Sequence, residues 1–323
     1  MRAFPRGLPA VAVAAVLAVT MAACGSTGSS GPGAHASTAA HAGSGFPATI
    51  VTPAGTVHVA RRPHAIVSLS PVGTEMLYAI GAGSQVKAVS SDSDYPPQAP
   101  RTKLNAYEPN IEAIVAEKPD LVIISPGTIP AAKQLAAKLA PFSIPVLDLV
   151  TPSGVSGTYT EFDELGQATG HLAQARQEDA RIRARLAAIV ASVPKPAKPI
   201  TYYYELDQTY YSITSDTFVG RLLGMLGMKS IADSASGAAS SGGYPQLSPE
   251  FILKANPDYI ILADTICCHQ SAATVAKRPG WSSLSAVREG HIIPLNDDIA
   301  SRWGPRITDL LAAVAAVIRR DGG

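Results

Sequence analysis

The side chains of this 323-residue chain that could do chemistry most directly are two neighbouring cysteines and two neighbouring aspartates. Cys267 and Cys268 precede His269, and Asp297 precedes Asp298. A strained vicinal disulfide and a pair of free thiols are equally compatible with the two cysteines. A metal site is a third interpretation, but it lacks a fourth ligand at a sensible spacing. The two aspartates fit an exposed turn better than an acid/base pair.

Motifs that commonly mark an enzyme are absent from the sequence. There is no G-x-S-x-G elbow, no Walker A loop and no G-x-G-x-x-G fingerprint. The histidines form no H-x-H or H-E-x-x-H pattern; they stand at positions 35, 41, 58, 64, 171, 269 and 291. We therefore predict a protein that is not an enzyme and has neither a cofactor nor a metal site.

The composition of the chain limits the classes of molecule that it could bind. Lys and Arg together number 26 against 25 Asp and Glu, a formal charge of +1. No basic excess is available to neutralise a run of phosphates, so we expect no nucleic-acid partner. Hydrophobic residues make up 46% of the chain, enough for a large core in one or two domains. Tyr supplies 11 of the aromatic residues, beside 6 Phe and 2 Trp, and suits a partly wet binding surface.

The chain begins with a pattern typical of a bacterial lipoprotein signal peptide, which we predict over residues 1–23. Arg2 and Arg6 precede an apolar run over 8–19, and Met-Ala-Ala leads into Cys24. The apolar run is too short for a comfortable membrane span. An ordinary signal peptide with an incidental cysteine is the alternative. We expect Cys24 to be lipidated, because it stands where cleavage would fall.

A small-residue segment follows, and we predict that residues 24–45 form the lipidated cysteine and a flexible tether. Of the 21 residues over 25–45, 16 are Gly, Ser or Ala, and none is a large apolar residue. Such a segment cannot bury surface to offset its chain entropy. The expected location is therefore extracytoplasmic, at the outer face of the cell membrane, with the lipid as anchor.

Beyond the tether, short apolar runs alternate with helical patterns, which indicates an α/β fold with parallel sheets. The expected strands cover 65–69, 85–89, 121–124 and 145–149, and the expected helices cover 74–80, with Thr74 as cap, 110–118 and 131–139. We predict an N-terminal lobe over 46–157 and a C-terminal lobe over 194–323.

A repeated sequence motif, called the echoed motif below, relates the two lobes. Glu112, six residues, Pro-Asp and a buried strand recur after Glu250, an offset of 138 (250 minus 112). Between the lobes, residues 158–193 contain no proline, and apolar side chains recur at helical spacing. One helix over this segment would be about 50 Å long and would hold the lobes nearly rigid.

Five stretches of the sequence together resemble the substrate-binding proteins of ABC importers for cobalamin, ferric siderophores and haem. The stretches are IVSLSPVGTEMLYAIG at 66–81, VSSDSDYPP at 89–97, NIEAIVAEKPDLVII at 110–124, PQLSPEFIL at 245–253 and PLNDDIASRWGPRI at 294–307. The resemblance covers roughly residues 61–320. It implies two Rossmann-like lobes joined by one long backbone helix, a ligand captured between them, and delivery to a membrane permease.

The resemblance also implies roles for individual residues. Glutamates at the positions of Glu112 and Glu250 lie on top of the two lobes in this family and pair with arginines of the permease. Other positions match residues of the ligand cleft: Tyr95, Tyr107, Tyr211, Tyr244, Arg302 and Trp303. Each of these aromatic residues could also be an ordinary half-buried side chain.

The type of ligand follows from the cleft residues that the resemblance implies. A wall rich in tyrosine and poor in charge suits a large, nearly neutral ligand, so we expect cobalamin or a related corrinoid. A ferric hydroxamate siderophore or haem is the alternative. A direct metal-ion binder of related fold is a rival of another class, disfavoured because no His, Asp and Glu set has ligand spacing. A hydrolase on the same scaffold ranks last, and we expect a monomer.

Overall fold

The computed structural model describes residues 45–125 and 129–321. The predicted signal peptide, Cys24 and all of the predicted tether except Gly45 lie outside these residues. Among the described helices, none is long and apolar enough to cross a membrane.

The N-terminal lobe is built on a parallel four-stranded sheet in the order β4-β3-β5-β6. Its strands are β3 (Ile66–Leu69), β4 (Val86–Val89), β5 (Leu121–Ile124) and β6 (Val146–Asp148), and its helices are α1 (Pro71–Ala79), α2 (Ile111–Ala116) and α3 (Ile129–Leu139). An antiparallel hairpin, β1 (Ala48–Thr52) and β2 (Gly55–Val59), precedes them. This hairpin was not among the elements expected from the sequence.

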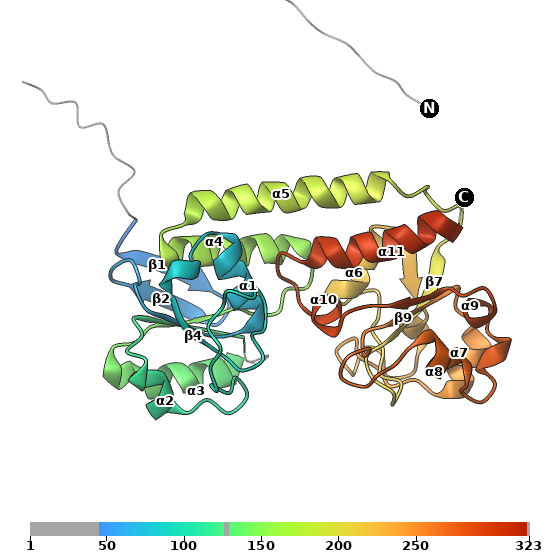
Figure 1. Cartoon of the computed structure of the whole chain (residues 1–323), viewed down its shortest axis with the longest axis horizontal. Coiled ribbons are helices and arrows are strands. Elements are labelled where there is room, and N and C mark those ends of the chain that lie inside the picture. Colours follow the sequence, from blue (N-terminus) through green and yellow to red (C-terminus); the bar gives the residue numbers. More distant parts are fainter. Residues whose placement is uncertain (1–44, 126–128, 322–323) are drawn as a thin grey trace, which may run out of the picture. The chain divides into compact units, whose positions relative to one another are not determined.

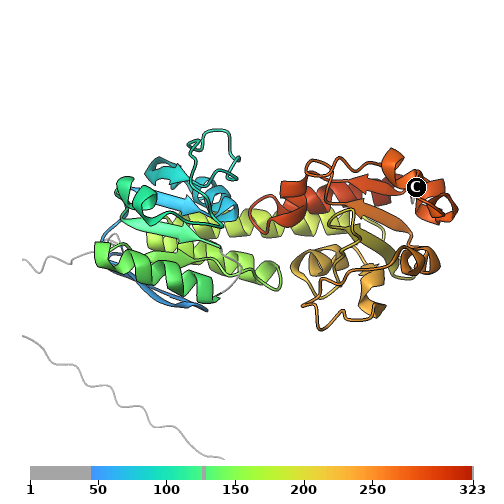
Figure 2. The same cartoon turned by 90° about the horizontal axis from the view of Figure 1, so that it is seen from below.

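Buried strands in this lobe divide their side chains between two cores. Ile66 and Ile123 pack with α1, whereas Val67 and Val122 pack with α2 and α3. Neighbouring residues of a strand point to opposite faces of the sheet. Because both faces of this sheet are buried, the sequences of these strands are nearly continuous apolar runs. Helices therefore cover both faces of the sheet (Figure 2).

The first helix begins earlier than predicted. Ser70, not Thr74, is its N-cap, and the Ser70 hydroxyl accepts a hydrogen bond from the Gly73 amide at 2.9 Å. Pro71 occupies the first turn, where its missing N–H costs nothing. Thr74 lies inside the helix, and its hydroxyl donates to the Ser70 carbonyl.

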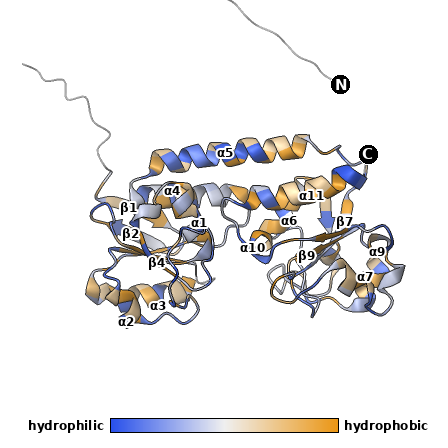
Figure 3. Cartoon of the chain, in the orientation of Figure 1, coloured by the Kyte–Doolittle hydropathy of each residue, from blue (hydrophilic) through white to orange (hydrophobic). Residues whose placement is uncertain are grey.

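The C-terminal lobe repeats this architecture with a parallel sheet in the order β10-β9-β7-β8. Its strands are β7 (Ile200–Glu205), β8 (Met228–Ser230), β9 (Tyr259–Leu262) and β10 (Ile292–Pro294). Its helices are α6 (Phe218–Gly224), α7 (Pro249–Ala255), α8 (Ala272–Ala276), α9 (Ser285–Arg288), α10 (Asp297–Ser301) and α11 (Ile307–Asp321). Strand β9 appears in the hydrophobic colours of Figure 3, which fits its fully buried position.

The Pro-Asp turn of the echoed motif has the same structural role in both lobes. The Asp120 carboxylate accepts hydrogen bonds from the backbone amides of His64 and Ala65, which lead into β3. The Asp258 carboxylate likewise accepts from the backbone amide and the hydroxyl of Thr201 in β7, both at 2.7 Å. In each lobe the Pro-Asp turn therefore fixes the start of the adjacent central strand.

The predicted single helix over 158–193 is two helices, and the prediction was wrong on this point. They are α4 (Val155–Thr169) and α5 (Leu172–Ala191). Gly170 adopts a left-handed φ of 76°, which ends α4. A Cβ on Gly166 would lie 2.8 Å from the Ala175 Cβ, so glycine permits the close packing of the two helices.

The long connecting element is α5, which has 20 residues, a length of about 30 Å. It packs on α4 and also on α11 of the C-terminal lobe (Figure 1). Its buried Ile182 and Leu186 belong to a cluster that includes residues of both lobes. One continuous core thus extends from the N-terminal sheet through α5 to the C-terminal sheet.

Candidate functional site

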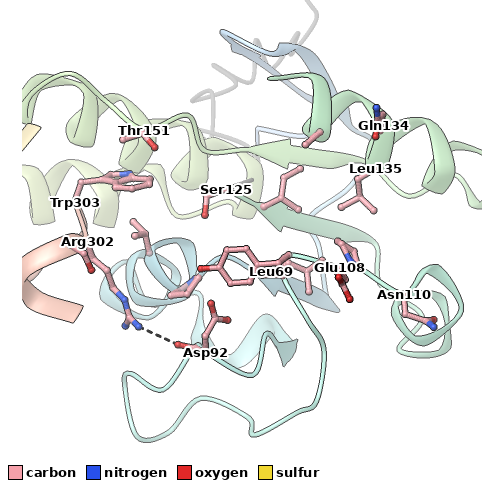
Figure 4. A pocket seen from close by; sticks show the side chains of 18 of the residues that line it. Leu69, Asp92, Glu108, Asn110, Ser125, Gln134, Leu135, Thr151, Arg302 and Trp303 are labelled. Atoms are coloured by element: carbon pink, nitrogen blue, oxygen red, sulfur yellow. Dashed lines mark hydrogen bonds between the residues drawn. The ribbon is translucent and has the colours of Figure 1, made fainter. Parts of the chain in front are cut away.

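A cavity of about 990 Å³ opens at the carboxyl ends of β3 and β5 (Figure 4). This edge of a parallel sheet is where ligands bind in open α/β folds. Most of its wall comes from the N-terminal lobe. The C-terminal lobe contributes Asp298, Ser301, Arg302 and Trp303.

Tyr107 is the one tyrosine among the predicted binding residues that lines this cavity. It is 88% exposed, on the loop that leads to α2. The Asn105 side chain holds the loop, because its carbonyl oxygen accepts hydrogen bonds from the amides of Tyr107 and Glu108 at 2.8 and 3.2 Å. An exposed aromatic ring held by an Asx turn is well placed to cover a ligand.

Several polar residues of the cavity wall were not predicted from the sequence. Asp92 follows β4, Ser125 follows β5 and Thr151 follows β6, and all three line the cavity. Gln134 and Lys138, one turn apart on α3, complete this group. The rule that sites form at the carboxyl ends of parallel strands would have found the first three.

Arg302 lines the cavity, but its guanidinium already has several partners. Its Nη1 lies 2.9 Å from Glu75 Oε1 and 3.2 Å from Asp94 Oδ1. Its Nη2 lies 2.6 Å from Asp298 Oδ1 and donates to the Asp92 carbonyl at 3.2 Å. Arg302 therefore belongs to a network of carboxylates. These carboxylates offset the positive charge of Arg302, which was expected to contact a ligand.

Trp303 also lines the cavity, and the structure fixes both ends of the residue. Its indole N–H donates to Glu161 Oε2 at 2.7 Å, and its carbonyl accepts from the Thr158 hydroxyl at 3.0 Å. Both partners lie on α4. The orientation of the ring against the cavity is therefore set by the helix behind it.

Three buried acids stand behind this wall. Burial raises the pKa of Glu161 to about 9; its hydrogen bond from Trp303 opposes the shift, and nearby Glu164 and Asp148 add to it. Burial, together with the charge of Asp148, raises the pKa of Glu164 to about 7. Burial alone raises the pKa of Asp148 to about 6. Glu161 is thus a neutral acid at physiological pH.

The other predicted tyrosines lie elsewhere. Tyr95 lines a neighbouring cavity of about 650 Å³, and the Arg306 guanidinium carbon lies 4.3 Å from the centre of its ring. Tyr211 and Tyr244 are about two-fifths exposed on the C-terminal lobe, and neither lines either cavity. Tyr211 forms an isolated bridge with Gln246, which keeps these two tyrosines in adjoining segments.

Glu112 and Glu250 occupy matching places, each exposed in the first turn of a short helix. Asn110 caps α2 by accepting from the Ala113 amide at 2.8 Å, and Ser248 caps α7 by accepting from the Phe251 amide at 3.1 Å. A carboxylate in the first turn also complements the helix dipole.

Cys267 and Cys268 are free thiols in the structure, so the vicinal disulfide considered above is not formed. Burial and hydrogen bonds with Cys268 and Asp297 raise the pKa of the Cys267 thiol to about 12.

Asp297 accepts hydrogen bonds from the backbone amides of Ile266 and Cys267 at 2.9 and 2.8 Å. The pair Asp297 and Asp298 therefore begins α10 and has structural partners; the expected exposed turn was wrong.

A metal site receives no support from the described part of the chain, where no group of three or more His, Cys, Asp or Glu side chains could hold an ion. The same holds for the metal site that was considered for Cys267, Cys268 and His269.

Comparison with known proteins adds independent evidence. A family model described as periplasmic binding protein matches residues 66–299. The chain is 29% identical over 286 residues to an uncharacterized ABC transporter substrate-binding lipoprotein of Bacillus subtilis, covering 85% of this chain and 87% of that protein. It is 30% identical over 321 residues to a cobalamin-binding protein of Halobacterium salinarum, covering 96% and 84%.

A solved structure from Staphylococcus epidermidis, described as a possible iron-binding (periplasmic solute-binding) protein, is similar in fold. Its TM-score is 0.69 at 28% identity, with 80% of this chain and 99% of that chain covered. The two-lobed α/β architecture with its long helix is therefore shared with proteins of this kind.

Proposed function

Because this chain belongs to the periplasmic binding protein family, we propose that it captures cobalamin or a related corrinoid and delivers it to an ABC permease, without doing chemistry. The observation that carries this proposal is the cavity of about 990 Å³ at the carboxyl ends of β3 and β5. Its volume lies at the upper end of the range for small-molecule sites, which suits a large ligand.

The chemistry of the wall supports a ligand with little net charge. Ser125, Gln134 and Thr151 offer uncharged hydrogen-bonding groups that match amide side chains such as those of a corrinoid. The charge of Arg302 is offset by carboxylates that lie within 3.2 Å. An anionic catecholate would need several cations with no such partners.

Iron uptake is the second candidate, through a ferric hydroxamate siderophore or haem. The favouring observation is the similarity to the Staphylococcus epidermidis protein described as possibly iron-binding. A hydroxamate complex is also large and low in charge, so the same cavity would accommodate it.

Calorimetric titration with cyanocobalamin, a ferric hydroxamate, haem and free Fe³⁺ tests the proposal. We expect saturable heat with cyanocobalamin, and Tyr107→Ala should weaken it about tenfold, or about 1.4 kcal/mol, because the exposed ring is lost. Phe142→Ala is the matched control, since Phe142 is 52% exposed and lines neither cavity. Absence of heat with cyanocobalamin but saturation with a ferric hydroxamate would transfer the proposal to iron.

The partners proposed are the transmembrane subunits of the permease and the membrane itself. We propose that Glu112 and Glu250 meet arginines of the permease, and that lipid on Cys24 anchors a monomer to the outer face of the cell membrane. The Bacillus subtilis relative is named a lipoprotein, which supports the anchor.

A further inference from the structure

We infer that the segment Arg302–Arg306 is a clasp, by which the C-terminal lobe holds the N-terminal lobe at one separation. The clasp segment has the sequence Arg-Trp-Gly-Pro-Arg and lies between α10 and α11. The segment contacts α1 and α4, which pack together in the N-terminal lobe, and Arg302 also contacts Asp94 and the Asp92 carbonyl in the loop after β4. The inference goes beyond capture and delivery, because it concerns what sets the geometry between the lobes.

Glu75 on α1 is the centre of the clasp. Its side chain is fully buried, yet two guanidinium groups from the other lobe bind it. Arg302 Nη1 lies 2.9 Å from Oε1, while Arg306 donates from Nε to Oε2 at 2.9 Å and from Nη2 to Oε1 at 2.5 Å. A buried carboxylate held by two guanidinium groups, of which Arg306 binds in forked geometry and Arg302 through Nη1 alone, leaves little freedom in the distance between the segments that carry them.

The rest of the segment is held as well. Trp303 is fixed to α4 through Glu161 and Thr158, as described above. Gly304 passes close to α1, where a Cβ would lie 3.5 Å from Val72 Cγ1 and 3.7 Å from Glu75 Oε2. Three of the five residues in the clasp segment thus contact the opposite lobe through hydrogen bonds, and a fourth lies against it.

Two consequences follow for the molecule. Arg302 and Trp303 line the cavity, so the same residues shape its wall and set the lobe separation. Helices α2 and α7 belong to opposite lobes, so the clasp also sets the distance between Glu112 and Glu250. Removing the Glu75 charge would leave the Arg306 guanidinium without its buried counter-charge and Arg302 with only the more exposed Asp94 and Asp298, which is unfavourable. The lobes would then separate to let solvent reach those groups.

Distance measurement by double electron–electron resonance tests the clasp. Spin labels at Lys133→Cys on α3 and Lys254→Cys on α7 report the separation of the lobes, since both sites are exposed. The background is the full chain with its native cysteines changed to serine: Cys24, Cys267 and Cys268. We expect one narrow distance in this background and a broader or longer distribution after Glu75→Gln.

Glu205→Gln is the matched control. Glu205 is also fully buried and is bound at 2.5 and 2.6 Å by a forked arginine, Arg278, but both residues belong to the C-terminal lobe. Its loss should lower stability in a similar way while leaving the narrow distance unchanged. A change in stability alone would therefore not mimic the expected result.

A second variant keeps the test decisive if Glu75→Gln fails to fold. Arg306→Lys retains the charge but loses the forked contact with Glu75, and we expect an intermediate broadening of the distance. If both variants fold and both keep the narrow distance of the background, the inference is wrong. If only Arg306→Lys folds, an unchanged narrow distance in that variant is enough to overturn the inference. The measurement uses no ligand, so its outcome is independent of whether the cavity binds cobalamin.

Discussion

Glu161 shows how a single buried acid links the cavity wall to the stability of the protein. Its Oε2 accepts from Trp303, while its Oε1 is buried without a hydrogen-bond partner. A buried carboxylate in this state favours the neutral form, which agrees with the raised pKa of about 9. The folded protein therefore holds a proton that the unfolded chain releases above about pH 4.5.

The pH dependence of stability follows from this difference. Because the folded state binds the extra proton, the contribution of Glu161 to stability falls as pH rises from about 4.5 to about 9. Glu161→Gln keeps the acceptor for Trp303 and has no proton to lose. We expect the variant to be more stable than wild type at pH 8 by several kcal/mol, since each pH unit above 4.5 costs the wild type about 1.4 kcal/mol, and by less than about 1 kcal/mol at pH 5.

Thermal or urea unfolding across this pH range measures the effect. Asp216→Asn is the control, because the side chain of Asp216 is 93% exposed and should alter the profile little. Parallel pH profiles of wild type and Glu161→Gln would show that the acid is ionised in the folded protein.

Individual residues were predicted with uneven success. Tyr107, Arg302 and Trp303 do line the cavity, because each adjoins a motif whose place in the fold is well defined. Two carboxylate partners of Arg302, Glu75 and Asp94, could not be predicted, since they are 227 and 208 residues away in sequence. The third, Asp298, is only four residues away. Tyr211 and Tyr244 belong to long loops of the C-terminal lobe, whose course depends on tertiary contacts that no local pattern records.

At the scale of elements, the echoed helix and strand were the most predictable part of the fold. Each copy combines a local cap, a Pro-Asp turn and a fully buried strand, so sequence neighbours decide its structure. The break at Gly170 was not predicted. A glycine in an otherwise helical pattern is compatible with a weakened helix or a turn, and here the packing of α4 on α5 selects the turn.

The two short helices lead to a prediction about transport. In the double variant Glu112→Ala with Glu250→Ala, the cavity is untouched, because neither residue lines it. We expect ligand affinity within about twofold of wild type and uptake into cells lowered at least about tenfold, since both proposed docking charges are lost.

Glu117→Ala with Glu289→Ala is a suitable control, because it removes one acid from each lobe outside these first turns. Uptake should remain close to wild type in the control. Normal uptake by the Glu112 and Glu250 double variant would exclude these residues as docking contacts.

For the whole molecule, the N-terminal segment leads to a prediction about location. If Cys24 carries the lipid, Cys24→Ser should release the protein from the membrane fraction into the soluble extracytoplasmic fraction. The folded part should be unaffected, so thermal unfolding of the released protein serves as the control. A variant that stays in the membrane fraction would show that another feature anchors the chain.

The cavity wall is shared unequally between the lobes, with four lining residues after residue 296 and the rest between 69 and 151. Ligand preference can therefore diverge through substitutions in the first half of the chain alone. The second half stays constrained by the inferred clasp and by α7, which carries the proposed docking residue Glu250. In evolutionary terms the molecule is modular: exchange of the N-terminal lobe between relatives should transfer cargo choice, provided that the residue matching Glu75 is retained.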